Sequence, residues 1–73
     1  MNYELKIALF PGSFDPFTRG HQAIVERALP MFDKLVIAIG VNRAKEGWMH
    51  IEERLERLRT QYANEPRVEV VAY

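Results

Sequence analysis

The residues best suited to chemistry lie in the stretch 10–21, which reads Phe-Pro-Gly-Ser-Phe-Asp-Pro-Phe-Thr-Arg-Gly-His. Ser13 and His21 supply side-chain hydrogen-bond donors, and a turn that opens a helix supplies free backbone N–H groups. The start of a helix also carries the positive end of the helix dipole, so such a turn favours a phosphate. Taken alone, a serine or histidine near a helix start is usually a cap or a solvent-facing residue. The elements around the turn must therefore show whether these two residues can bind a phosphate.

An apolar run precedes this stretch, and a helical pattern follows it. Residues 5–10 are apolar except for one lysine, which is typical of a strand buried on both faces, and the Pro-Gly pair that follows is expected to end it. Apolar residues at helical spacing then predict a helix over residues 19–29, with Thr18 or Asp15 as its cap. The turn therefore lies between a strand end and a helix start, where α/β sheets bind ligands.

Gly20 is unusual in the first turn of that predicted helix. Glycine in a helix costs about 1 kcal/mol relative to alanine, so its presence needs a reason. Two explanations stay open: a ligand that approaches the backbone closely, or tight packing against the neighbouring strand.

A second strand is predicted over residues 34–41, because this apolar, β-branched run is too short and uniform for an amphipathic helix. Strands joined through a helix are parallel and almost always connected in a right-handed sense, so their carboxyl ends share one sheet edge. The polar loop that follows is expected to face the turn and contains Asn42, Arg43, Lys45 and Trp48. For Trp48, we favour a role in covering the loop over a role in binding adenine.

A second helix is predicted to begin near residue 51 and to end at the Asn-Glu-Pro sequence 64–66, and residues 68–72 form a third strand. The buried stripe of this helix is expected to contain Ile51, Leu55, Leu58 and Tyr62. Its charged residues, such as Glu53 and Arg57, are spaced for ion pairs on a solvated face and do not suggest a catalytic carboxylate cluster.

The composition is that of one small globular domain: 73 residues, 48% apolar and 27% charged, with no net charge and no cysteine. Balanced charge gives no reason to expect nucleic acid or an acidic membrane surface as a partner. The two histidines find no third ligand, so no metal site on the protein is expected. No apolar run approaches the ~20 residues that span a bilayer, and no signal peptide is evident, so we expect a cytoplasmic protein.

The order strand, helix, strand, helix, strand, taken with the turn, resembles the N-terminal part of the bacterial phosphopantetheine adenylyltransferases. These belong to the wider nucleotidyltransferase superfamily with its T/H-x-G-H motif. The resemblance rests on Phe-Pro-Gly-Ser-Phe-Asp-Pro at 10–16 and on Thr-Arg-Gly-His at 18–21. It continues through 28–30, 32–33, 36–42, 45, 52–54 and 68–71, so that it covers essentially the whole chain.

This resemblance implies an α/β, Rossmann-like nucleotidyltransferase fold. Residues 1–73 would form a single, incomplete domain, the β-α-β-α-β part with strand order 3-2-1 from a family sheet ordered 3-2-1-4-5. The family segments that hold the nucleotide lie beyond Tyr73, so the source of base specificity lies outside this sequence. We therefore expect residues 1–73 alone to be unstable or to associate, and to be inactive.

The resemblance also implies transfer of an adenylyl group from ATP to 4′-phosphopantetheine, which gives dephospho-coenzyme A and pyrophosphate in coenzyme A biosynthesis. A phosphate monoester is already anionic, so its direct in-line attack needs positioning and charge neutralisation more than a general base. His21 would stabilise charge on the α-phosphate in the transition state. Ser13, with the backbone of Ser13 and Phe14, would hold phosphate oxygens of both substrates, and Lys45 would bind the incoming phosphate.

Mg²⁺ would accompany ATP, held mainly by phosphate and water oxygens, and the complete enzyme would be a homohexamer. The chain departs from the family pattern at Ser13, where threonine is usual, and at Glu46, where a basic residue is common.

Two alternatives stay open. One is a related nucleotidyltransferase with another acceptor, against which Thr18 and the spacing of Lys45 argue. The other is a catalytically incomplete fragment that binds phosphorylated ligands.

Overall fold

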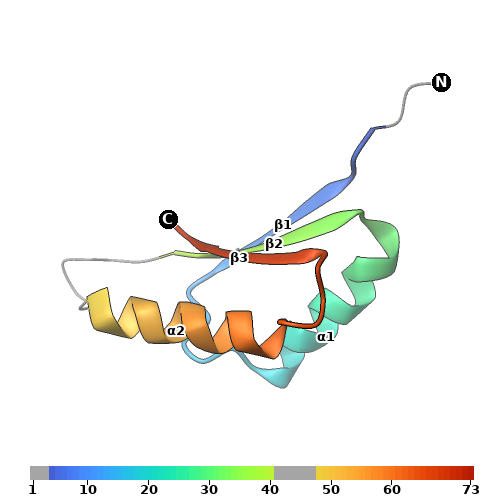
Figure 1. Ribbon diagram of the computed structural model, residues 1–73. Coiled ribbons are helices and arrows are strands. Elements are labelled where there is room, and N and C mark those ends of the chain that lie inside the picture. Colours follow the sequence, from blue (N-terminus) through green and yellow to red (C-terminus); the bar gives the residue numbers. More distant parts are fainter. Residues whose placement is uncertain (1–3, 41–47) are drawn as a thin grey trace.

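The computed structural model describes residues 4–40 and 48–73, with the backbone alone at 48 and 49. Three strands alternate with two α-helices and one short 3₁₀ helix (Figure 1). In chain order the elements are β1 (Ile7–Gly12), α1 (Arg19–Ala28), η1 (Leu29–Met31), β2 (Lys34–Ile39), α2 (Trp48–Gln61) and β3 (Val68–Ala72). No helix in the described ranges is long and apolar enough to cross a membrane.

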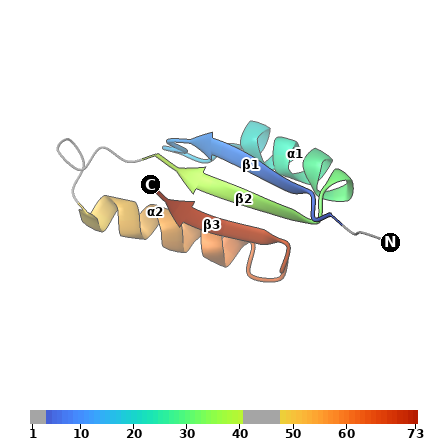
Figure 2. The same cartoon turned by 90° about the horizontal axis from the view of Figure 1, so that it is seen from above.

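The three strands form one parallel sheet with β2 in the centre, in the order β1-β2-β3 (Figure 2). Leu35 of β2 lies opposite Ala8 of β1 on one side and Val68 of β3 on the other. This arrangement confirms the Rossmann-like α/β fold and the strand order 3-2-1 that the sequence predicts. It also places the carboxyl ends of all three strands at one edge of the sheet.

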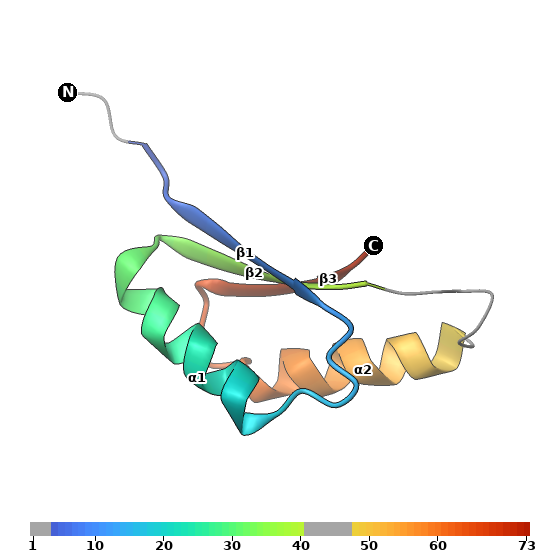
Figure 3. The same cartoon turned by 180° about the vertical axis from the view of Figure 1, so that it is seen from behind.

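The core lies between the sheet and the two helices, which cover the same face of it (Figures 1 and 3). The side chains of this core that are almost fully shielded from solvent are Val25, Leu35, Ile37, Ile39, Ile51 and Leu58. The stripe predicted on α2 is confirmed, since Ile51, Leu55 and Leu58 are buried and Tyr62 packs against them while partly exposed.

The prediction that the first strand is buried on both faces is wrong. Its side chains alternate between partly buried and exposed, with Ile7 54% and Leu9 66% exposed. Both helices pack on the opposite face, so nothing in the described part of the chain covers these two side chains. A continuous apolar run shows that a strand is suited to burial on both faces. It does not show which other segments, if any, cover those faces.

Element boundaries differ from the predicted ones at several ends. β1 continues through Gly12, because an edge strand tolerates the missing N–H of Pro11, and the Gly12 carbonyl accepts from the Gly40 N–H at 2.8 Å. β2 ends at Ile39 within the described residues, α1 passes into η1 after residue 28, and α2 begins at residue 48 instead of near 51. β3 has the predicted bounds.

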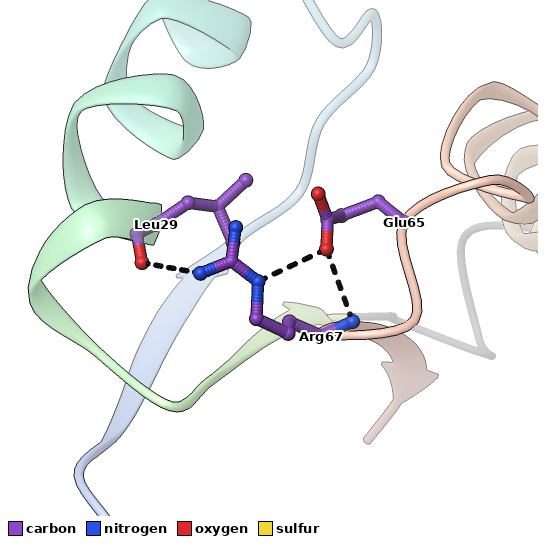
Figure 4. A network of polar contacts seen from close by, with 3 residues as sticks. All are labelled: Leu29, Glu65 and Arg67. Carbon is purple, nitrogen blue, oxygen red and sulfur yellow. Dashed lines mark hydrogen bonds and ion pairs between the residues drawn. The ribbon is translucent and has the colours of Figure 1, made fainter.

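Arg67 joins the beginning of β3 to the end of α1 (Figure 4). Its Nε donates to Glu65 Oε1 at 3.1 Å, and one of its terminal nitrogens donates to the carbonyl of Leu29 at 3.0 Å. Leu29 is the C-cap of α1, and its carbonyl also accepts from the Phe32 N–H at 3.4 Å, so Arg67 provides it with a second donor. The hydrogen bonds from Arg67 lower the pKa of the Glu65 carboxyl below its usual range.

Candidate functional site

The candidate site is the loop 13–18, which leaves β1 at its carboxyl end and enters α1 (Figure 3). Phe14 is its anchor: the side chain is only 4% exposed, although the backbone adopts the left-handed region with φ 48°. This conformation is rare for a bulky residue, and burial of the aromatic ring offsets its strain. A Cβ at Gly12 would lie 2.9 Å from that ring, so only glycine leaves room for it.

Arg54 of α2 holds the same loop from the side. One terminal nitrogen donates to the Ser13 carbonyl at 3.1 Å, and the other lies 3.3 Å from Asp15 Oδ2 in an ion pair. The Arg54 side chain is only 12% exposed. Asp15 therefore shapes the loop, and a guanidinium from a helix distant in sequence fixes the backbone of Ser13.

Arg54 has a role that the sequence analysis missed. The sequence contains a signal for it, because position 54 lies three residues after Ile51 and next to Leu55, on the apolar side of α2. A charged residue at such a position needs a partner that compensates for its partial burial.

His21 is fixed by the first turn of α1. Thr18 is the N-cap, as one of the two predicted alternatives, and its Oγ1 accepts from the His21 N–H at 3.4 Å. In return, the Thr18 backbone N–H donates to His21 Nδ1 at 2.9 Å. This is a capping box in which histidine takes the place of the usual glutamate or glutamine.

Three phenyl rings surround the imidazole of His21. The ring centres of Phe14 and Phe17 lie 5.1 Å and 5.4 Å from it, and that of Phe10 lies at 6.1 Å. Phe14 meets the imidazole edge to face, at 89°. Packing and hydrogen bonding together therefore restrict the orientation of His21.

The aromatic cluster extends to Tyr62, the residue directly after α2, whose ring lies 6.1 Å from that of Phe17. The Tyr62 hydroxyl is buried and has no hydrogen-bond partner among the described residues. Burial, and secondly the negative charge of Glu26, raise the pKa of Tyr62. Tyr62 therefore stays neutral at physiological pH and serves as packing behind the loop.

Of the two explanations for Gly20, tight packing against the neighbouring strand is wrong. A Cβ there would meet a single atom of the described residues, Thr18 Oγ1, at an ordinary contact distance of 3.6 Å. The described residues leave the space above this turn open, and close approach of a ligand there stays a prediction.

The structure brings three of the predicted site residues together at one sheet edge: Ser13, Phe14 and His21. Ser13 is exposed and His21 is partly exposed, so both can meet a ligand. Lys45, with the predicted loop that contains Asn42 and Arg43, lies outside the described residues. The side chain of Trp48, for which a role in covering the loop was predicted, lies outside the described part of the chain as well.

A pocket of about 580 Å³ opens beside this loop, between it and α2. Phe14 and Phe17 form part of its wall, and Arg54, Arg57 and Glu53 give its rim charges of both signs. Ser13 and His21 do not line it, so they form an open surface at the end of β1. Among the described residues, no group of three histidine or carboxylate side chains could hold a metal ion.

Comparisons with known proteins agree with this geometry. A family model described as cytidylyltransferase-like matches residues 9–73. A phosphopantetheine adenylyltransferase of Porphyromonas gingivalis is 52% identical over 67 residues, which cover 92% of this chain and 44% of that protein. Proteins of the same name from Christiangramia forsetii and Phocaeicola vulgatus are 49% and 48% identical over 69 residues, 94% of this chain and 46% of each relative. The chain thus spans slightly less than half of the length of these curated relatives.

Proposed function

The chain belongs to the cytidylyltransferase-like family, and from this premise we propose that the full-length protein is a phosphopantetheine adenylyltransferase. It transfers the adenylyl group of ATP to 4′-phosphopantetheine and releases pyrophosphate and dephospho-coenzyme A. This is a step of coenzyme A biosynthesis, and we propose a cytoplasmic enzyme.

The observation that carries this proposal is the 52% identity to a protein of that name over 92% of the chain. The geometry supports it, because a serine and a histidine flank the loop where a parallel strand ends and a helix begins. Such a place suits the phosphate groups that both substrates carry.

Each site residue has a role in the in-line attack of the acceptor phosphate on the α-phosphorus of ATP. An oxygen of the acceptor forms the new P–O bond as the bond from the α-phosphorus to pyrophosphate breaks, and no enzyme residue is covalently modified. Negative charge grows on the α-phosphate oxygens, and His21 stabilises it by donating a hydrogen bond. The rate gain comes from holding the two phosphates in line and from neutralising their charge.

Ser13 and the backbone of Ser13 and Phe14 bind phosphate oxygens, and the brace from Arg54 to the Ser13 carbonyl keeps that backbone in place. Lys45 binds the incoming phosphate of 4′-phosphopantetheine. A cation suits this role because it offsets the repulsion between two anionic substrates.

Mg²⁺ fits this site only as a companion of ATP. Asp15 is engaged by Arg54, and the described residues offer no set of three carboxylate or imidazole ligands. Phosphate and water oxygens would therefore provide most of its ligands, as Mg²⁺ prefers. Bound there, the ion would neutralise charge on the phosphates of ATP.

The proposal is tested by pyrophosphate release from the full-length protein with a panel of nucleotides and acceptors. ATP with 4′-phosphopantetheine should be the productive pair. CTP in place of ATP, or nicotinamide mononucleotide in place of 4′-phosphopantetheine, should give no product. Release with a different acceptor would identify another nucleotidyltransferase of the superfamily. Binding of ATP and 4′-phosphopantetheine without any release would instead reject an enzymatic function.

A further inference from the structure

We propose that Thr18 is a positioning residue that holds His21 as the neutral tautomer with its proton on Nε2. The catalytic meaning of this inference rests on the proposed function, but the tautomer itself does not. It identifies which ring nitrogen carries the hydrogen atom that His21 can offer to a phosphate.

The first observation is the bond from the Thr18 backbone to the imidazole. A backbone N–H can only donate, and it lies 2.9 Å from His21 Nδ1, so Nδ1 accepts and carries no proton. A neutral imidazole without a proton on Nδ1 has its proton on Nε2. An imidazolium carries a proton on both nitrogens and would lose this bond.

The second observation is that the hydroxyl of Thr18 points to the same nitrogen. Thr18 Oγ1 lies 3.0 Å from Nδ1 and accepts the His21 backbone N–H at 3.4 Å. Since the hydroxyl oxygen accepts from this N–H, its own hydrogen is available for Nδ1. Two donors of Thr18 therefore converge on one nitrogen of His21.

The third observation is that the ring has little freedom to turn. Phe14 packs on it edge to face at 5.1 Å and Phe17 at 5.4 Å. Rotating the ring by half a turn would place a carbon atom against the Thr18 N–H and leave this donor without its acceptor. Packing and the capping box therefore favour the same orientation.

The consequence is chemical. A neutral imidazole with its proton on Nε2 stabilises a phosphate oxygen by donating a hydrogen bond, and it keeps that proton throughout the step. His21 then acts as a hydrogen-bond donor and not as a general acid. This agrees with a reaction in which the acceptor is already an anion and pyrophosphate leaves without needing a proton.

Nitrogen NMR of the full-length protein, labelled with ¹⁵N in histidine, tests the inference directly. Correlations between ring nitrogens and ring carbon-bound protons distinguish the two tautomers, and loss of signals in His21→Gln assigns the residue. We expect His21 to show an unprotonated Nδ1 and a protonated Nε2. His50, exposed in the first turn of α2, gives the second histidine signal in the same spectrum. A proton on Nδ1 of His21, or signals averaged over the two tautomers, would overturn the assignment.

Two variants test the part of Thr18. Thr18→Ser keeps both donors, whereas Thr18→Val keeps the shape and the backbone N–H but loses the hydroxyl. We expect Thr18→Val to lower kcat roughly fivefold, the fold-change of one ordinary hydrogen bond, with the KM for ATP unchanged. It should also shift the His21 nitrogen signals toward averaging, and Thr18→Ser should leave both readouts as they are. If Thr18→Val changed neither kcat nor the signals, its hydroxyl would have no positioning role.

These outcomes separate the inference from the proposed function. A protein with the Nε2-protonated His21 but without adenylyl transfer would retain the tautomer and reject the function. A protein that transfers adenylyl groups with a proton on Nδ1 of His21 would retain the function and reject the tautomer.

Discussion

Gly12 and Gly20 flank the loop between β1 and α1 for different physical reasons. At Gly12, the ring of Phe14 occupies the space of a Cβ, at 2.9 Å. At Gly20 that space is open apart from an ordinary contact with Thr18 Oγ1. The packing of Phe14 therefore requires the first glycine, whereas no tight contact among the described residues requires the second.

Alanine at these two positions should have opposite effects on stability. Gly20→Ala should raise the free energy of unfolding by up to about 1 kcal/mol, since alanine favours the helix. It should nevertheless lower kcat/KM for ATP, because a methyl group would occupy the ligand's place. Gly12→Ala should instead cost about 1–3 kcal/mol, because the Phe14 ring must move. Urea unfolding and steady-state kinetics measure both effects, and a Gly20→Ala enzyme with unaltered kcat/KM would show that no ligand approaches there.

His21 is the residue on which the proposed chemistry depends most. Replacing it with alanine should lower kcat about 10²-fold or more, the typical effect of losing one donor that stabilises transition-state charge. Substrate binding should change less, because the interaction strengthens as charge develops. His50→Ala is the matched control, since it removes the chain's other histidine, which is exposed and lines the neighbouring pocket and not the surface formed by Ser13 and His21, and it should keep kcat. A folded His21→Ala enzyme with normal turnover would contradict the role.

At the scale of elements, α2 does more than cover the sheet, because Arg54 ties it to the backbone of Ser13 and to Asp15. Arg54→Met should lower the free energy of unfolding by about 1–2 kcal/mol through the lost bonds. It should also lower kcat/KM, since the loop would no longer be held in its phosphate-binding form. Arg27→Met, at an exposed position in the last turn of α1, is the matched control and should leave kcat/KM unchanged. Equal losses of kcat/KM in the two variants would mean that Arg54 acts only through its positive charge and not through its bonds to the loop.

Most of the architecture could be predicted from the sequence, because its signals are local. Hydrophobic period and turn residues suffice for two helices, three strands and their parallel direction, whereas they leave the cap of α1 open between Thr18 and Asp15, and the structure assigns it to Thr18. The Arg54 brace could not be predicted in the same way, since it joins residues that are distant along the chain. The predicted start of α2 is too late, because the prediction assigns Trp48 to the polar loop although its spacing from Ile51 continues the apolar stripe.

The candidate site was predicted less completely than the fold. Ser13, Phe14 and His21 were identified from the signature, and their proximity is a finding of the structure. The capping box that orients His21 depends on how the side chains and backbones of Thr18 and His21 are placed. A sequence motif specifies residue types and spacing, and it does not specify this placement. Exposure of β1 likewise depends on which face the helices cover, and its apolar sequence is equally compatible with cover on one face or on both.

At the scale of the whole molecule, the sheet face opposite the helices and the sheet edge formed by β1 are uncovered in the described part of the chain. β1 pairs with a single strand, and Leu5, Ile7 and Leu9 expose 67%, 54% and 66% of their side chains. An edge with free N–H and C=O groups beside apolar side chains favours association. The homohexamer expected for the full-length enzyme stays a prediction.

Residues 1–73 produced alone should therefore associate in solution and lack adenylyl transfer. Light scattering gives the mass, and urea gives the cooperativity of unfolding. Leu9→Lys, which puts a charge on the uncovered face, should reduce association without altering the helix-covered core. A monomer that unfolds cooperatively and releases pyrophosphate would contradict this prediction.

The central claim is that the full-length protein moves AMP from ATP to 4′-phosphopantetheine. Its most direct measurement follows ATP labelled at the α-phosphorus through the reaction. The account predicts that the label appears in dephospho-coenzyme A, in amounts equal to the pyrophosphate released, and that His21→Ala suppresses both products together. Label that stays in ATP in the presence of both substrates, or moves to an acceptor other than 4′-phosphopantetheine, would contradict it.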